Sequence, residues 1–185
     1  MKPIFIVTCT AAAIIGVLAY FAAISVTFVP GVAALYPAAA FEAVFGAWFG
    51  IYGAIASYIG LLFAGATGGW FSIQTGIFLS VSDFILALAP AIAARRGVFD
   101  PALPTASDAF KFWAVSLFLG SLPGSLVYNF INLQLGALAG WNSFWVAVLG
   151  WNIGNAIVLA ALGVPLARIG TALIKKRGLY VQGLL

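Results

Sequence analysis

Long runs of apolar residues, separated by short polar or glycine-rich connections, are the dominant pattern of this chain. The apolar runs are 4–28, 33–66, 71–94, 110–135 and 143–174. A transmembrane helix needs about 20 consecutive apolar residues, so four of these runs have the length of one membrane span, the last leaving the bilayer near Arg168. The run 33–66 is too long for one span. We interpret it as two short helices that share a tight turn around "GIYG".

The positions of lysine and arginine favour this division, because basic residues stay on the cytoplasmic side of a membrane protein. All lysine and arginine residues lie on the same side of the membrane only if 33–66 crosses the bilayer twice or not at all. The predicted fold is therefore an all-α integral membrane protein, a single domain over 1–185 and a compact bundle of six transmembrane helices with both termini cytoplasmic. The expected helices are roughly 4–28, 37–51, 52–66, 71–94, 110–135 and 143–168, and the cytoplasmic basic residues are Lys2, Arg95, Arg96, Lys111, Arg168, Lys175, Lys176 and Arg177.

The first apolar run also has features of a signal peptide. Lys2 fits the positively charged start of such a peptide, and cleavage after it would leave the orientation of the other helices unchanged. The run is much longer than the 7–15 residues usual for a signal peptide, and no firm cleavage site follows it. We therefore interpret 4–28 as the first helix of the bundle.

Composition supports a membrane protein and excludes several kinds of chemistry. Hydrophobic residues make up 64% of the 185 residues and charged residues only 6%, whereas soluble domains carry about 25% charged residues. The chain has no histidine and one cysteine, Cys9, so metal clusters, Cys/His nucleophiles and structural disulfides are not expected. No phosphate-binding loop or hydrolase motif is present. The net charge of +4 is explained by membrane orientation rather than by nucleic-acid binding.

Several polar side chains nevertheless fall inside the predicted helices. A central Asp or Lys in a transmembrane helix costs about 2.5–3.5 kcal/mol against lipid, so such groups should face the bundle interior or a water-filled cavity. With the predicted orientation they gather between the midplane and the outer surface. The candidate substrate-binding residues are Glu42, Gln74, Asp83, Asn129, Asn132, Trp145, Trp151, Asn152 and Asn155.

Their spacing indicates two helix faces that present paired amides. Asn152 and Asn155 are three residues apart, and so are Asn129 and Asn132, so each pair shares a face. Amides with aromatic neighbours suit a pocket for a polar or heterocyclic ligand that opens outward. The alternative is that the amides join helices by hydrogen bonds. Asp83 could equally pair inside the bundle, stay protonated or relay protons, and Glu42 is the better ligand group because it lies higher.

A stripe of small residues follows the first helix. Small residues four apart let helix backbones approach closely. Packing within the bundle explains the glycines of the second, third and sixth helices. The stripe of the first helix extends to its cytoplasmic end and could accept a helix from another protein. The candidate docking residues are Thr8, Ala12, Gly16 and Ala19.

Taken together, the glycine-rich pair "FGAWFGIYGAIASYIG", the small-residue first helix and "WNIGNAIVLAALGVPLAR" before a basic tail resemble the S components of energy-coupling factor (ECF) transporters. The resemblance covers nearly the whole chain. It implies a prokaryotic plasma-membrane receptor that captures a vitamin or other micronutrient from outside, beneath the loop between the first two helices and against the last three. It also implies docking of the first helix onto a transmembrane coupling subunit that carries two ATPases. Here Thr8–Ala12–Gly16 stands where that family has a plain alanine pair.

Parts of the sequence also fit two other functions. The stretch "LYPAAAFEAVFGAWFG" also looks like membrane-integral sensor domains, which are normally fused to a kinase or cyclase. Only eight residues follow Arg177 here, so a sensor would need a separate signalling partner. An intramembrane enzyme is disfavoured because only Asp83 and Glu42 could perform acid–base work and no nucleophile is paired with a base. No catalytic residue, metal site or cofactor is therefore predicted, and any ATP hydrolysis is assigned to partner subunits.

Overall fold

The computed structural model describes residues 3–23, 27–29, 32–33 and 35–184 and is almost entirely helical over these ranges. Five stretches of helix are long and apolar enough to cross a membrane: Ile4–Ala22, Ile51–Gly68, Ile73–Arg95, Ala106–Gln134 and Trp141–Lys176. Their apolar length is what the sequence pattern predicts for a helical membrane protein. Several of them are divided into shorter helical elements. In chain order the elements are α1 (Pro3–Ala23), β1 (Thr27–Val29), β2 (Val32–Ala33), α2 (Ala38–Phe49), α3 (Ile51–Gly68), α4 (Ile73–Leu79), α5 (Val81–Arg95), α6 (Ala106–Ala114), η1 (Val115–Ser121), α7 (Leu122–Gln134), α8 (Trp141–Val158), η2 (Leu159–Gly163) and α9 (Val164–Lys176).

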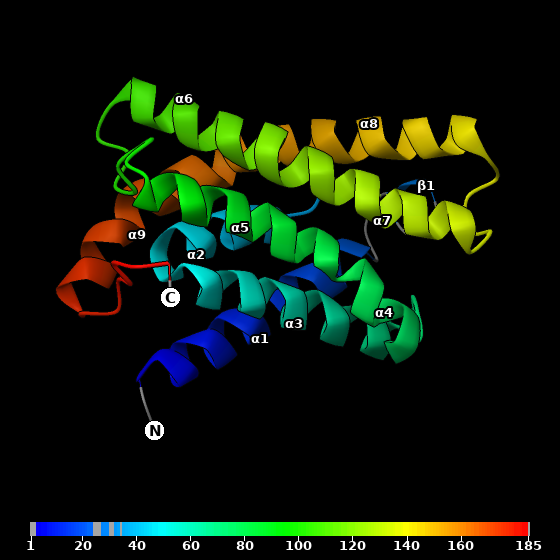
Figure 1. Cartoon of the computed structure of the whole chain (residues 1–185), viewed down its shortest axis with the longest axis horizontal. Helices are drawn as coiled ribbons and strands as arrows, with labels where there is room; N and C mark the ends of the chain where they lie inside the picture. The colour runs from blue at the N-terminus through cyan, green and yellow to red at the C-terminus, as the bar shows by residue number, and fades with distance from the viewer. Residues whose placement is uncertain (1–2, 24–26, 30–31, 34, 185) are drawn as a thin grey trace.

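The two ends of the bundle differ in charge (Figure 1). The start of α1, the α5–α6 connection and the end of α9 lie together at one end, which we call the charged end. The α3–α4 connection, the α7–α8 connection and β1 lie at the opposite, uncharged end, where the sequence has no Lys, Arg, Asp or Glu. The described basic residues therefore gather at one end of the bundle, as the sequence predicts. On which side of a membrane that end lies stays a prediction.

The helix α2 corrects the expectation of six spanning helices. It has 12 residues, which is about 18 Å of helix against about 30 Å of apolar bilayer. It is buried on nearly all sides: every residue except Phe41 is buried, with α3, α5, α1, α8, η2 and α9 packed around it. Apart from Glu42 its residues are apolar or small, which suits a helix enclosed within the protein. Within the described ranges, five helices therefore have spanning length, and four of them pack on the short helix α2.

Gly50 separates α2 from α3, within the predicted turn. Its φ of +64° lies in the region that glycine adopts without a steric penalty. A Cβ there would also approach the carbonyl oxygen of Leu184 to 2.6 Å. The division of 33–66 into two helices is therefore confirmed, and its boundary depends on one glycine.

The first helix is shorter than predicted. It ends at Ala23 rather than at residue 28, and Thr27–Val29 instead forms a strand that pairs antiparallel with Val32–Ala33. The predicted residues 24–26 lie outside the described part of the chain. Threonine and valine favour extended structure, which explains why an apolar run can change from helix to strand without a change in hydrophobicity.

Two of the long spans contain a wide π-helical turn that precedes a proline. The π-helical segment η1 comes before Pro123 near the start of α7, and η2 comes before Pro165 near the start of α9. Proline has no N–H to donate to the preceding turn, so the regular helical hydrogen bond is missing there. Wide turns of this kind often occur near functional sites.

Candidate functional site

Two carboxyl groups meet in the interior of the bundle. Glu42 on α2 and Asp83 on α5 are both 0% exposed. The Tyr36 hydroxyl lies 3.2 Å from Glu42 Oε1 and 2.9 Å from Asp83 Oδ2, and the Ser82 hydroxyl donates to Asp83 Oδ1 at 3.0 Å. We call these four residues the Glu42–Asp83 cluster.

The packing of α2 on α5 brings the two carboxyl groups together. Gly46 lies so close to the carbonyl oxygen of Ala87 that a Cβ at Gly46 would overlap it. Both helices run from the uncharged end towards the charged end. Residues one turn before this close contact therefore face each other as well, and these are Glu42 and Asp83. The glycine that permits the contact thus also positions the acids.

The short length of α2 explains why a tyrosine from the preceding connection reaches this depth. Because α2 occupies only part of the bilayer thickness, the residues just before it lie inside the bundle. Tyr36, two residues before Ala38, is half-buried and hydrogen-bonds to Asp83 in the first turn of α5. Asp83 itself lies 12 residues before Arg95, about 18 Å along the helix from the charged end.

The cluster has no cationic partner within the described part of the chain. There, the single ion pair joins Lys175 to Asp100 at 3.8 Å, at the charged end. Arg95 donates to backbone carbonyls rather than to a carboxylate. Among the described residues, the two acids of the bundle interior therefore contact hydroxyl groups and each other, and no counter-ion.

Aromatic rings line one side of the cluster. The ring of Trp151 lies 6.2 Å from that of Tyr36 and 5.0 Å from that of Tyr128, measured between centroids. The indole N–H of Trp151 is buried and has no hydrogen-bond partner, and the same is true of Glu42 Oε2 and of Asn129 Oδ1. Buried polar atoms are nearly always paired in folded proteins. Two of these unpaired atoms, Glu42 Oε2 and Trp151 Nε1, lie in or beside the cluster and therefore indicate a place where a ligand could bind.

The amides predicted on α8 instead join two helices. Asn152 donates to Ser125 Oγ at 2.8 Å and accepts from Ser121 Oγ at 3.0 Å, and Asn155 donates to Ser121 Oγ at 2.9 Å. These bonds connect α8 to η1 and α7. The interpretation of these two asparagines as helix-joining groups, left open from the sequence, agrees with this geometry. Ser121 and Ser125 were missed because small hydroxyl residues on an apolar helix give no distinct sequence pattern.

The amides predicted on α7 bond to their own helix. Asn129 donates to the carbonyl oxygen of Ser125 at 2.8 Å, and Asn132 donates to that of Tyr128 at 3.1 Å. Asn129 is fully buried, whereas Asn132 is only partly buried. Of the two, Asn129 is therefore the one placed to contribute to an interior site.

Two predicted site residues lie on the outside of the bundle. Trp145 is 52% exposed, and Gln74 is exposed near the start of α4. Trp145 packs edge-on against Phe144 rather than against the cluster. Both were predicted inside because the rotation of their helices cannot be read from the sequence, and the exposed positions are typical of aromatic and polar residues near a membrane interface.

The small-residue stripe of α1 packs largely within the chain. Ala12 and Ala19 are buried, and a Cβ at Gly16 would lie 3.2 Å from the carbonyl oxygen of Gly60 on α3. The stripe therefore lets α1 approach α3, and these residues serve packing inside the bundle. The remaining predicted docking residue, Thr8, donates its hydroxyl to the carbonyl oxygen of Ile4.

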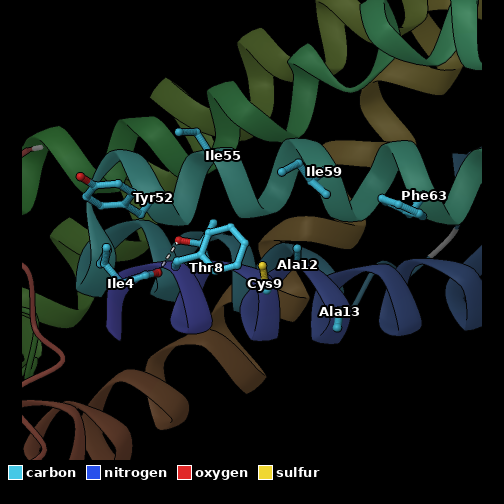
Figure 2. A pocket seen from close by; sticks show the side chains of 10 residues that line it. Ile4, Thr8, Cys9, Ala12, Ala13, Tyr52, Ile55, Ile59 and Phe63 are labelled. Atoms are coloured by element: carbon cyan, nitrogen blue, oxygen red, sulfur yellow. Dashed lines mark hydrogen bonds between the residues drawn. The ribbon is translucent and has the colours of Figure 1, made fainter. Parts of the chain in front are cut away.

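Beside this contact lies an apolar groove of about 560 Å³ between α1 and α3 (Figure 2). Thr8, Cys9, Ala12 and Ala13 line one wall and Tyr52, Ile55, Ile59 and Phe63 the other. The hydroxyl of Thr8 is already used within its own helix. The groove thus offers shape and apolar surface rather than hydrogen-bonding groups.

Comparisons of the chain with protein-family models, with curated proteins and with solved structures found no match.

Proposed function

We propose that this chain is the substrate-binding S component of an ECF-type transporter in the plasma membrane, and that it captures a small vitamin-like molecule from the side of the uncharged end. The observation that carries the proposal is the Glu42–Asp83 cluster with Trp151 beside it. Polar groups that only stabilise packing are expected to satisfy one another. Here several buried atoms have no partner, so an occupant that bonds to them explains why they persist in an apolar bundle.

The location of the cluster supports capture from the uncharged end. That end has no charged residue to repel or compete for a ligand, and β1 and β2 pack on α8, the helix that carries Trp151. The basic residues stand at the opposite end, which the positive-inside rule assigns to the cytoplasm. A molecule that enters from outside would therefore meet Tyr36 and Trp151 before it meets any cation.

The first experiment is to identify small molecules released from protein that has been purified in mild detergent. Mass spectrometry of the denatured sample should show one compound in near-stoichiometric amount, absent from an unrelated membrane protein purified in the same way. Release of lipid and detergent alone would contradict the receptor proposal.

Two neighbouring substitutions on α8 separate binding from packing. Trp151→Phe keeps a ring but removes the unpaired N–H, so affinity for the released compound should fall about tenfold, the equivalent of one hydrogen bond. Asn152→Ala removes the bonds to Ser121 and Ser125, so it should lower the free energy of unfolding by about 1 kcal/mol and leave affinity unchanged. The opposite pattern would move the site from Trp151 to the asparagines.

The partner in this proposal is a transmembrane coupling subunit that carries two ATPases and binds the groove between α1 and α3. Ala13 is exposed and lines the groove, so Ala13→Trp should fill it and reduce co-purification with the coupling subunit. Thr10→Trp is the matched control, since Thr10 is exposed on the same helix but does not line the groove. Gly16→Leu is unsuitable because it would separate α1 from α3. Equal assembly of the two tryptophan variants would contradict docking at this groove.

Uptake distinguishes transport from sensing. Vesicles that contain the chain with a coupling subunit and ATPases should accumulate the released compound when ATP is supplied. Tight binding without uptake would favour the alternative, a membrane-integral sensor that acts on a separate signalling protein.

A further inference from the structure

We propose that the ligand of the Glu42–Asp83 cluster is a small organic cation, an ammonium or amidinium group attached to a ring, and that Glu42 Oε2 binds its positively charged nitrogen. This inference rests on the proposed function and adds the chemical class of the substrate.

The two acids differ in how far they are satisfied. Both carboxylate oxygens of Asp83 have a hydroxyl within hydrogen-bonding distance: Tyr36 at 2.9 Å, and Ser82 at 3.0 Å, whose proton is shared with the carbonyl oxygen of Leu79 at 2.8 Å. Glu42 has only the longer contact of 3.2 Å from the same hydroxyl, and that hydroxyl has a single proton to give. Because Glu42 Oε2 has no partner, Asp83 serves to hold Tyr36, and Glu42 presents the free acceptor.

The environment favours a donor that carries positive charge. Two carboxyl groups share one buried hydroxyl, and within the described ranges no Lys or Arg reaches either of them. A buried carboxylate is stable only when it is paired and hydrogen-bonded. A carboxyl pair buried in this way either shares a proton or binds a cation: a neutral or anionic ligand leaves the pair dependent on the shared proton, whereas a cation with N–H groups pairs with both carboxylates.

The rings beside the cluster suit the remainder of such a ligand. Trp151 and Tyr128 form an aromatic wall with their centroids 5.0 Å apart, and Tyr36 continues it to the acids. Aromatic faces attract cations and also stack on planar rings. The unpaired indole N–H of Trp151 could donate to a ring nitrogen or oxygen, which is an independent indication of a ligand because this atom does not belong to the acidic pair.

Three probes of the same size test the charge requirement: benzylammonium, benzyl alcohol and benzoate. Each is added to the purified wild-type protein, and the rise in Tm with probe concentration gives an apparent affinity. Benzylammonium should stabilise the protein, and the other two should bind at least tenfold more weakly. Equal stabilisation by benzyl alcohol or benzoate would overturn the inference, as would the absence of any shift with benzylammonium up to its solubility limit.

Glu42→Gln keeps the shape of the side chain and removes its charge. It should weaken benzylammonium binding at least tenfold, whereas Asp100→Asn, at an exposed acid of the charged end, should not change it. Wild-type affinity in the Glu42 variant would contradict the assignment. Should that variant fail to fold, the wild-type comparison of three probes still decides. The compound released in the mass spectrometry experiment separates the two proposals. A neutral or anionic compound would refute the cationic ligand but not the receptor proposal. If no compound is released, the receptor proposal is refuted.

Discussion

Arg95 shows how a single side chain can complete a helix end inside an apolar bundle. Its guanidinium donates to the carbonyl oxygens of Gly46 and Trp48 at 3.2 Å, and to that of Ala47 at 2.5 Å. It also donates to Val181 and Gly183 of the C-terminal segment, at 2.6 and 3.0 Å. The last carbonyls of a helix have no partner within the helix, and lipid offers none. The N–H groups of Gly50 and Val181 also donate to Gly46 and Trp48, so Arg95 completes the end of α2 together with them and fixes the segment that packs against it.

We expect Arg95→Ala to lower the free energy of unfolding by at least about 2 kcal/mol, because several buried carbonyl oxygens would lose a charged donor. Arg95→Lys should lower the free energy of unfolding by a smaller amount, since an ammonium group keeps the charge but lacks the planar fork of donors. The neighbouring Arg96 is exposed, so Arg96→Ala should change stability by less than about 0.5 kcal/mol. Reversible unfolding in mixed micelles measures all three, and equal effects of the two alanine variants would contradict this role.

At this scale the sequence predicted that polar residues lie in the interior but not which of them meet. Glu42 and Asp83 could be chosen because a carboxyl group in an apolar helix needs a reason to be there. Tyr36 could not, because it belongs to a connection whose depth depends on the length of α2. Trp145 and Gln74 were grouped with the interior residues because of their depth in the predicted helices, and depth does not fix which way a helix is rotated.

Among the elements, the contact between α2 and α5 determines the site. Gly46 lets the two helices approach until backbone meets backbone, and Gly120 and Gly124 do the same between α5 and the span that contains η1 and α7, with Cβ distances of 2.8 and 2.6 Å to carbonyl oxygens of α5. In lipid no hydrophobic effect drives helices together, so association depends on close packing, which small residues at such positions allow. At these glycines the central helices thus approach each other by backbone contact.

Gly46→Ala should therefore destabilise the protein by about 1–3 kcal/mol, because the added methyl overlaps the carbonyl oxygen of Ala87 and pushes α2 away from α5. It should also weaken ligand binding, since Glu42 would move with α2. Gly163→Ala is the control: its Cβ would lie at an ordinary 3.4 Å from the Phe112 ring, so stability should be unchanged or slightly higher. Unfolding and binding measured on both variants test the prediction, which fails if Gly46→Ala is tolerated.

The elements themselves were partly predictable. The excess length of the run 33–66 indicated two helices, and Gly50 separates them. The π-helical turns η1 and η2 could not be predicted, since a proline in an apolar run indicates that the helix is distorted but not whether it bends or widens into a π-helical turn. The pairing of β1 with β2 was hidden because these short strands lie inside a long apolar run whose length matches that of a transmembrane helix.

The molecule as a whole has one charged and one uncharged end, and this polarity sets its expected orientation. Seven of the eight basic residues fall within the described part of the chain, and all seven lie at or near the charged end. Arg168 donates to the carbonyl oxygen of Leu103 at 3.0 Å, and Lys175 pairs with Asp100, so these cations also hold the α5–α6 connection. Orientation and local structure therefore depend on the same residues.

Cysteine labelling in intact cells tests the orientation. In a Cys9→Ser background, Leu135→Cys at the exposed α7–α8 connection should react with a membrane-impermeant maleimide, whereas Arg96→Cys should react only after lysis. The reason is that basic residues are retained in the cytoplasm. Reaction at position 96 in intact cells, with position 135 protected, would reverse the arrangement and place the cluster on the wrong side for uptake.

The hydrogen bonds to the carbonyl groups at the end of α2 can form only in a certain order during biosynthesis. When α2 and α3 leave the ribosome, the carbonyl groups at the α2 end have not yet met Arg95, which follows Ala47 by 48 residues. The hydrogen bond from Arg95 to Val181 forms later still, because Val181 follows Arg95 by 86 residues. The central helix therefore enters the membrane with its end exposed, and a nascent chain stalled before residue 181 should be a target for membrane proteases.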